Sequence, residues 1–75
     1  MKRIHVILQT LATGMIRITG LHDYRTVASE DGNLCDVKAI YERIAKQTAS
    51  HHMIRGVVCE EYVEINKELK AALAM

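Results

Sequence analysis

Seventy-five residues can form one hydrophobic core but not two, because single domains usually run to roughly 100 to 150 residues, so we predict a single domain over residues 1–75. The formal charge is +1, from ten Lys and Arg against nine Asp and Glu, and this balance argues against nucleic acid as the default partner. Neither Phe nor Trp occurs, so the core is expected to be aliphatic.

The first dozen residues fit two secondary structures. A helical stripe ending at Gly14 is formed by Ile4, Ile7, Leu8, Leu11 and Met15. The positions Ile4, Val6 and Leu8 also alternate as they would in a strand. Lys2 and Arg3 would lie at the positive end of the helix dipole, with no capping residue before them. We therefore favour a strand, with a helix over residues 2–13 as the alternative.

Two short segments rich in β-branched residues follow, at residues 15–19 and 24–28. Residues 20–23 join them and predict a β-hairpin. The glycines Gly14, Gly20 and Gly32 are all expected in turns.

A helix is predicted over residues 36–48, with Asn33 or Asp36 as its cap. The spacing i, i+3, i+4, i+7 and i+11 draws one apolar stripe through Val37, Ile40, Tyr41, Ile44 and Thr48. We expect this stripe to be buried.

The last third of the chain begins with a polar break at residues 49–52, which precedes an apolar segment at residues 53–59 that is typical of a buried strand. A second helix is predicted over residues 60–74, with a stripe through Tyr62, Ile65, Leu69, Ala72 and Leu73. In the alternative, residues 60–65 end a strand and the helix starts at an Asn66 cap.

These elements predict an α+β fold, a small two-layer sandwich in which two helices pack on one face of a three- to four-stranded sheet. A helix at the N-terminus in place of the first strand would change the order of elements. The longest uncharged apolar run near the N-terminus, residues 6–16, is too short to cross a bilayer. We expect a cytoplasmic protein.

Metal ligands are few. Cys35, His51, His52 and Cys59 could form a small ligand or metal site if they converged at one end of the sheet, but they lack the spacing of a zinc motif. We therefore expect no stoichiometric zinc and no cofactor. Cys35 and Cys59 are each expected as small buried hydrophobic residues. If Cys35 instead lay at the N-terminus of the first predicted helix, the helix dipole would lower the pKa of its thiol and favour the thiolate.

No Gly-x-Ser-x-Gly elbow and no Walker pattern occur, so we predict a protein that is not an enzyme. We expect a small binding module that forms a homodimer and acts by protein–protein interaction. The apolar residues proposed for its interface are Met15, Tyr62, Leu69, Leu73 and Met75. The alternative is a nucleic-acid-binding protein whose sheet face carries Arg3, Arg17, Arg25 and Arg55.

Overall fold

The computed structural model describes residues 4–52 and 63–75. The elements in chain order are β1 (Ile4–Thr10), β2 (Ile16–His22), β3 (Arg25–Gly32), a short 3-10 helix η1 (Leu34–Asp36), α1 (Val37–His52), β4 (Val63–Ile65) and α2 (Lys67–Leu73). The strands form one four-stranded sheet in the order β3-β2-β1-β4. β4 runs parallel to β1, whereas the pairs β1–β2 and β2–β3 are antiparallel. The predicted α+β fold is confirmed.

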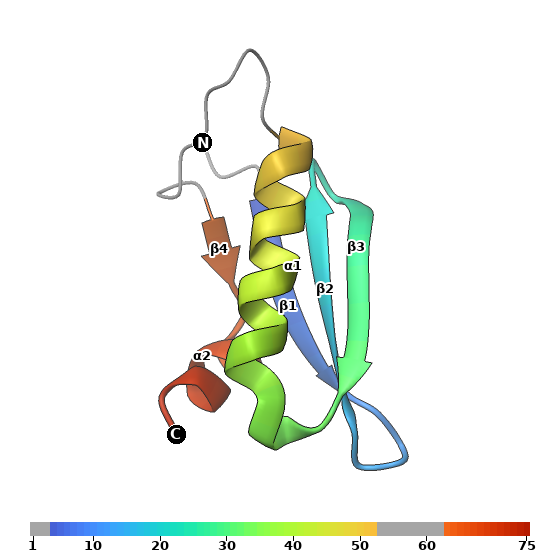
Figure 1. Cartoon of the computed structure of the whole chain (residues 1–75), viewed down its shortest axis with the longest axis vertical. Helices are drawn as coiled ribbons and strands as arrows, with labels where there is room; N and C mark the ends of the chain where they lie inside the picture. Colours follow the sequence, from blue (N-terminus) through green and yellow to red (C-terminus); the bar gives the residue numbers. More distant parts are fainter. Residues whose placement is uncertain (1–3, 53–62) are drawn as a thin grey trace.

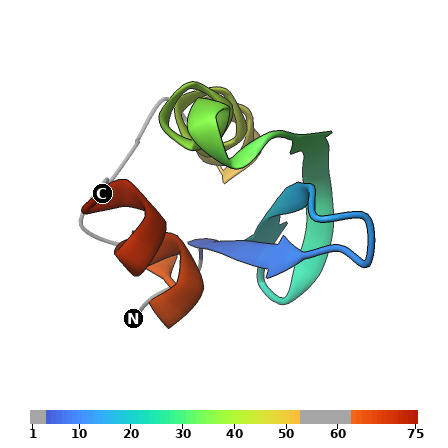
Figure 2. The same cartoon turned by 90° about the horizontal axis from the view of Figure 1, so that it is seen from below.

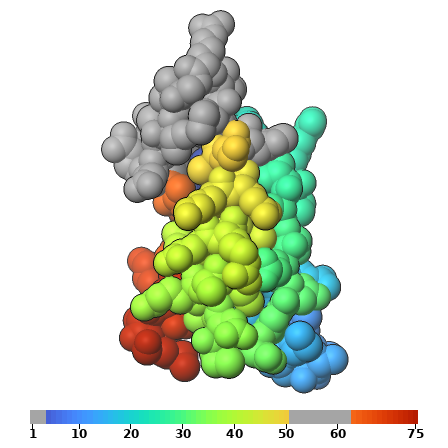
Figure 3. Space-filling view, viewed as in Figure 1, coloured from blue at the N-terminus to red at the C-terminus, as the bar shows by residue number. Residues whose placement is uncertain are grey.

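The two helices and the sheet enclose a single aliphatic core. α1 runs along the strands and packs against β1, β2 and β3, as Figure 1 shows, and its side chains cover this face in Figure 3. α2 packs against β1 and against α1, near the β4 edge (Figure 2). The buried apolar residues are Ile4, Val6, Leu8, Ile16, Ile18, Val37, Ile40, Ile44, Leu69 and Ala72. This is the two-layer arrangement expected from the pattern of elements.

The N-terminal segment is a strand, as favoured above, and the helical alternative is wrong. Ile4, Val6 and Leu8 are buried in the core, whereas His5 and Ile7 point to the other face. The helical stripe would have left Val6 outside the core, and Val6 is fully buried. Pairing with strands on both sides therefore decides the conformation.

Two hairpins connect the first three strands. Between β1 and β2, the Leu11 amide donates to the Met15 carbonyl at 2.8 Å, and Gly14 adopts the left-handed conformation with φ +87°. Between β2 and β3, the turn is only two residues long, Asp23 and Tyr24, and both have positive φ (51° and 67°), as in a type I′ turn. The predicted hairpin exists, but residues 20–22 belong to β2 rather than to the turn.

Gly20 and Gly32 lie in strands and not in turns, contrary to the sequence prediction. A Cβ atom on Gly20 would lie 1.8 Å from Oγ1 of Thr48, and one on Gly32 would lie 2.5 Å from Cδ1 of Ile40. Both glycines therefore allow α1 to approach the sheet closely.

Helix α1 has the predicted buried stripe, but it is longer than predicted. The expected break at residues 49–52 is wrong, because these residues continue the helix to His52. Asn33 makes no side-chain cap hydrogen bond, and its carbonyl instead accepts from the Asp36 amide at 3.0 Å in η1.

The C-terminal part follows the alternative prediction. A helix over residues 60–74 is wrong, because Val63–Ile65 form strand β4 and the helix begins only after Asn66. The Asn66 Oδ1 atom accepts from the amides of Leu69 and Leu8, each at 3.1 Å, and its Nδ2 donates to the Leu8 carbonyl at 3.1 Å. Asn66 thus ends the β1–β4 pairing and caps α2 at the same time. The strand predicted over residues 53–59 lies outside the described residues.

Candidate interaction surface

The sheet has one face on which no described helix packs, as Figure 2 shows on the side of β1–β3 away from α1. The strand registers place three rows of side chains across it. We call this surface the open face, and its members are His5, Ile7, Gln9, Arg17, Thr19, Leu21, Thr26, Ser29, Asp31 and Glu64. Half-buried Ile7 and Leu21 lie among polar and charged neighbours, a mixture typical of protein interaction surfaces.

One ion pair dominates the electrostatics of the open face. Arg17 donates from Nε to Asp31 Oδ1 at 2.7 Å and from Nη2 to Oδ2 at 3.0 Å. These hydrogen bonds, helped by the charge of the guanidinium, lower the pKa of Asp31 below its usual value and raise that of Arg17. Beyond this pair the face carries the carboxylate of Glu64, which lies 3.9 Å from Nδ1 of His5. The charge of Arg17 is therefore neutralised within the face.

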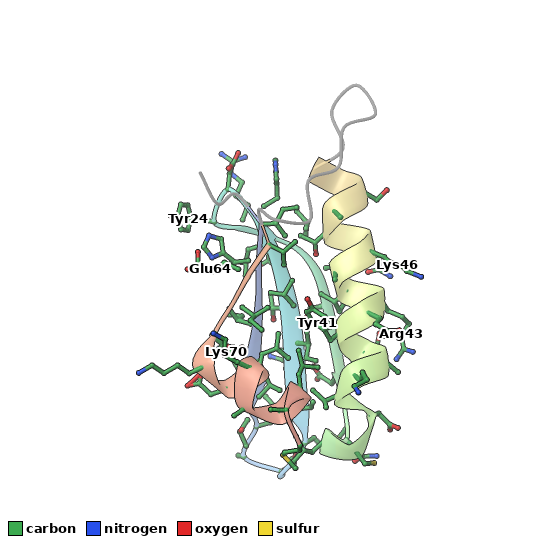
Figure 4. The ribbon with its side chains drawn as sticks, turned by 90° about the vertical axis from the view of Figure 1, so that its left-hand side faces the viewer. Tyr24, Tyr41, Arg43, Lys46, Glu64 and Lys70 are labelled. Carbon is green, nitrogen blue, oxygen red and sulfur yellow. The ribbon has the colours of Figure 1, made fainter. Side chains whose placement is uncertain are left out.

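Tyr24 borders the open face and is unusual in two ways. Its backbone is left-handed, which costs a non-glycine residue of order 1 kcal/mol or more, and its side chain is 81% exposed. Its ring lies 5.2 Å from the ring of His5, centroid to centroid. Figure 4 shows Tyr24 and Glu64 together on the side of the sheet away from α1. The turn thus holds a large aromatic side chain in solvent beside the open face.

The surroundings of Tyr24 have two further features. The Nε2 atom of His5 is buried and has no hydrogen-bond partner in the described structure. An open hollow of about 660 Å³ adjoins the turn and is lined by His22, Asp23, Arg25, Thr26 and Val27. A buried polar atom without a hydrogen bond costs free energy.

The predicted metal ligands do not converge in the described structure. Cys35 lies in η1 before the start of α1, whereas His51 and His52 form its end. A 16-residue helix spans about 24 Å, so Cys35 and the histidine pair are far apart. Within residues 4–52 and 63–75, no three His, Cys, Asp or Glu side chains form a metal-binding group. Cys59 lies outside these ranges.

Cys35 is exposed, so the prediction that it is a buried packing residue is wrong. Its position explains the difference, because η1 contains no buried residue and lies at the end of the sandwich rather than on the α1 stripe. Its thiol is free.

The arginines of the nucleic-acid hypothesis are spread out. Arg17 pairs in register with Asp31 near the end of β3, whereas Arg25 pairs with His22 at its beginning. Arg25 is exposed. Arg3 and Arg55 lie outside the described residues. The two described arginines of this set therefore do not form a basic cluster.

The predicted apolar interface is divided between core and surface. Leu69 is fully buried inside the chain, so its side chain is not available to a second copy. Leu73 is half-buried against the core, whereas Met15 (38%) and Met75 (87%) are exposed. Tyr62 lies outside the described residues. The C-terminal stripe thus belongs largely to the core.

Comparison of the chain with protein-family models, with curated proteins and with solved structures finds no match. Among the residues that the structure describes, no helix is both long and apolar enough to cross a membrane. The open face and Tyr24 were not singled out from the sequence. The alternation of polar Arg17 and Thr19 with apolar Ile16 and Ile18 was the available signal, because it marks a strand with one polar face, although Thr19 is itself buried in the structure.

Proposed function

We propose that this chain is a small binding module without enzymatic activity, which docks onto another protein through the open face and Tyr24. One observation carries the proposal: Tyr24 is held exposed, in a backbone conformation unfavourable for tyrosine, at the border of a sheet face on which no described helix packs. Tyrosine is enriched among the residues that dominate binding energy at protein interfaces, because its ring is large, rigid and amphipathic.

A protein partner has more support than nucleic acid. A phosphate-binding face requires several uncompensated cations. On the open face the guanidinium of Arg17 is bound by Asp31, and Glu64 adds a second carboxylate. A small-ligand or metal module has less support still, because α1 separates Cys35 from His51 and His52.

We also propose that the module is cytoplasmic. The free, exposed thiol of Cys35 is compatible with a reducing compartment, where such thiols persist.

The proposal can be tested by site-specific photo-crosslinking in the cells that make the protein. A photoreactive amino acid at Gln9, which is exposed on the open face in β1, should give one defined adduct with a protein other than this chain. The same amino acid at Glu42, which is exposed on α1, serves as the control and should not give this adduct. Adducts with nucleic acid, or equal adducts from both sites, would contradict the proposal.

The protein identified in this way would then be purified and its affinity measured by calorimetry. Tyr24→Gly should weaken binding about 30-fold, which corresponds to a loss of about 2 kcal/mol at a central interface residue. Glycine suits the left-handed position, so the hairpin should remain folded. Leu34→Ala, at an exposed apolar residue in η1 and not on the open face, should bind like the parent. Unchanged affinity of Tyr24→Gly would refute the role of Tyr24.

A further inference from the structure

Strand β3 is an open edge of the sheet. It forms one end of the order β3-β2-β1-β4, and no described element lies beyond it in Figure 1. Its eight residues exceed the usual strand length of about five or six. In an antiparallel pair, alternate residues direct their amide and carbonyl groups away from the partner strand, so part of the β3 backbone is free to pair with another strand.

The side chains of β3 do little to block such pairing. The strand contains neither proline nor lysine, which commonly protect edge strands, and its centre is made of small residues at positions 26–29. The charged side chains Arg25, Glu30 and Asp31, which can also discourage pairing, lie only near the two ends of the strand, and its centre is interrupted by a β-bulge at Val27. It limits regular pairing at that residue but leaves the strand free on both sides.

The charges of β3 suit a second copy of the same strand. Arg25 lies at its beginning and is exposed, whereas Glu30 and Asp31 lie near its end. When two copies pair antiparallel about a two-fold axis, each Arg25 lies opposite Glu30 and Asp31 of the other strand, which already share their charges with Arg43 and Arg17, so an additional contact of Arg25 with these carboxylates forms twice. A parallel arrangement would place like charges together.

We propose that two copies of the chain dimerise through their β3 edges, with the strands antiparallel and the two sheets joined into one. The proposal deepens the proposed function, because it assigns the self-association of the binding module to one strand. Glu30 and Asp31 keep their intramolecular partners Arg43 and Arg17, and each carboxylate has lone pairs left for a further donor. With the axis perpendicular to the sheet, both α1 helices lie on one side and both open faces on the other.

Analytical ultracentrifugation over a range of concentrations tests this dimer. The parent should be a dimer, and Arg25→Glu should weaken it about tenfold or more, because it turns two attractive contacts into repulsive ones. Lys67→Glu makes the same change in charge at an exposed position on α2 and should remain dimeric. Glutamate is also favourable at the start of that helix. Circular dichroism should show all three proteins folded.

A charge swap gives the stronger test. Arg25→Glu mixed with a Glu30→Lys, Asp31→Lys variant should form a heterodimer, while each alone should be largely monomeric. Circular dichroism should show that the double-lysine variant stays folded although it loses its ion pairs with Arg43 and Arg17. Hydrogen exchange should show amides of β3 becoming protected as the parent concentration rises, with no change in α2. Two results would overturn the proposal. One is a parent protein that stays monomeric at high concentration, which would mean that the bulge protects the edge. The other is a dimer that Arg25→Glu does not weaken.

The two proposals fail separately. A monomer that still binds a protein through its open face refutes the β3 dimer alone. A β3 dimer whose open face binds no protein refutes the proposed function alone.

Discussion

The contact between Gly20 and Thr48 gives the sharpest test of how α1 is seated on the sheet. A Cβ atom at position 20 would lie 1.8 Å from Oγ1 of Thr48 and 3.0 Å from Cγ2 of Ile44. Thr48 is fully buried, and its hydroxyl donates to the Ile44 carbonyl at 2.7 Å, so moving it away breaks a buried hydrogen bond. Gly20→Ala should therefore force α1 away from β2.

Gly20→Ala should lower the free energy of unfolding by about 2–3 kcal/mol, the upper end of the range for overpacked cores. The cost is high because the new methyl group meets the Thr48 hydroxyl, which is buried and held by its hydrogen bond to the Ile44 carbonyl. Lower entropy of the unfolded chain offsets about 0.4–1 kcal/mol of this. A domain of this size has a total stability of roughly 4–11 kcal/mol. In a domain of 60–100 residues each kcal/mol corresponds to about 4–8 °C in Tm, so the loss should be plain in a thermal scan.

A double-mutant cycle followed by urea unfolding and circular dichroism identifies the cause. Thr48→Ala alone should destabilise the chain, but Gly20→Ala combined with Thr48→Ala should be more stable than Gly20→Ala alone, because the clashing oxygen is gone. Gly32→Ala is the matched control: its clash is with Cδ1 of Ile40, the far end of a side chain that can rotate, so it should cost less. Parental stability of Gly20→Ala, or strictly additive effects, would refute the seating of α1 described here.

Two further predictions concern stability. Asn66→Ala should cost about 2–4 kcal/mol in urea unfolding, because it removes the α2 cap and two hydrogen bonds to Leu8, whereas Asn66→Asp keeps both accepting contacts and should cost less; equal costs would contradict this. The Arg43 guanidinium, mainly through its hydrogen bonds, lowers the pKa of Glu30 in the folded chain. The pair therefore stabilises the fold at pH values above the ordinary carboxyl pKa, and this stabilisation is lost as the pH falls below about 5. Arg43→Gln should make acid unfolding less steep between pH 5 and the transition, and an unchanged profile would contradict the assignment.

Local patterns predicted the elements that bury one face along their whole length. Val37, Ile40 and Ile44 recur at helical spacing, and α1 buries all three. The first dozen residues fit both a helical and a strand period, and the unfavourable position of Lys2 and Arg3 at a helix start favoured the strand, which is correct. In each case the signal lies in consecutive residues, which is where periodicity is informative.

The errors arose where tertiary contacts override local preference. Residues 49–52 look like a polar break, yet the helix continues through them. Residues 60–65 carry glutamates typical of a helix start, yet Val63–Ile65 pair with β1. The pairing of β4 with β1 and the double role of Asn66 depend on contacts between residues far apart in the chain, and Leu8 and Asn66 are 58 positions apart. No local sequence pattern contains such contacts. Gly20 was assigned to a turn for the same reason, because its partner Thr48 lies on a distant helix.

The candidate site escaped prediction because apolarity was used as the guide to binding. Leu69 is apolar and was predicted at the interface, but it is buried in the core. The residue that stands out in the structure is Tyr24, and its distinguishing feature is a positive φ, which the sequence does not display. A two-residue turn that contains Asp23 but no glycine would have indicated a positive φ at Tyr24. This indication was missed because the turn was predicted over four residues, 20–23.

The open face and the β3 edge share residues, and this links the two proposals physically. Thr26, Ser29 and Asp31 lie on the open face and also belong to the edge strand. Pairing two β3 strands about an axis perpendicular to the sheet would join two open faces into one continuous surface, with one Tyr24 from each copy bordering it. Such a surface is symmetric, so a partner that binds one half should also bind the other. A complex of two partner molecules with one dimer follows from both proposals together, whereas one partner with one chain follows from the open face alone. The stoichiometry measured by sedimentation therefore shows whether the binding face is one sheet or two sheets joined.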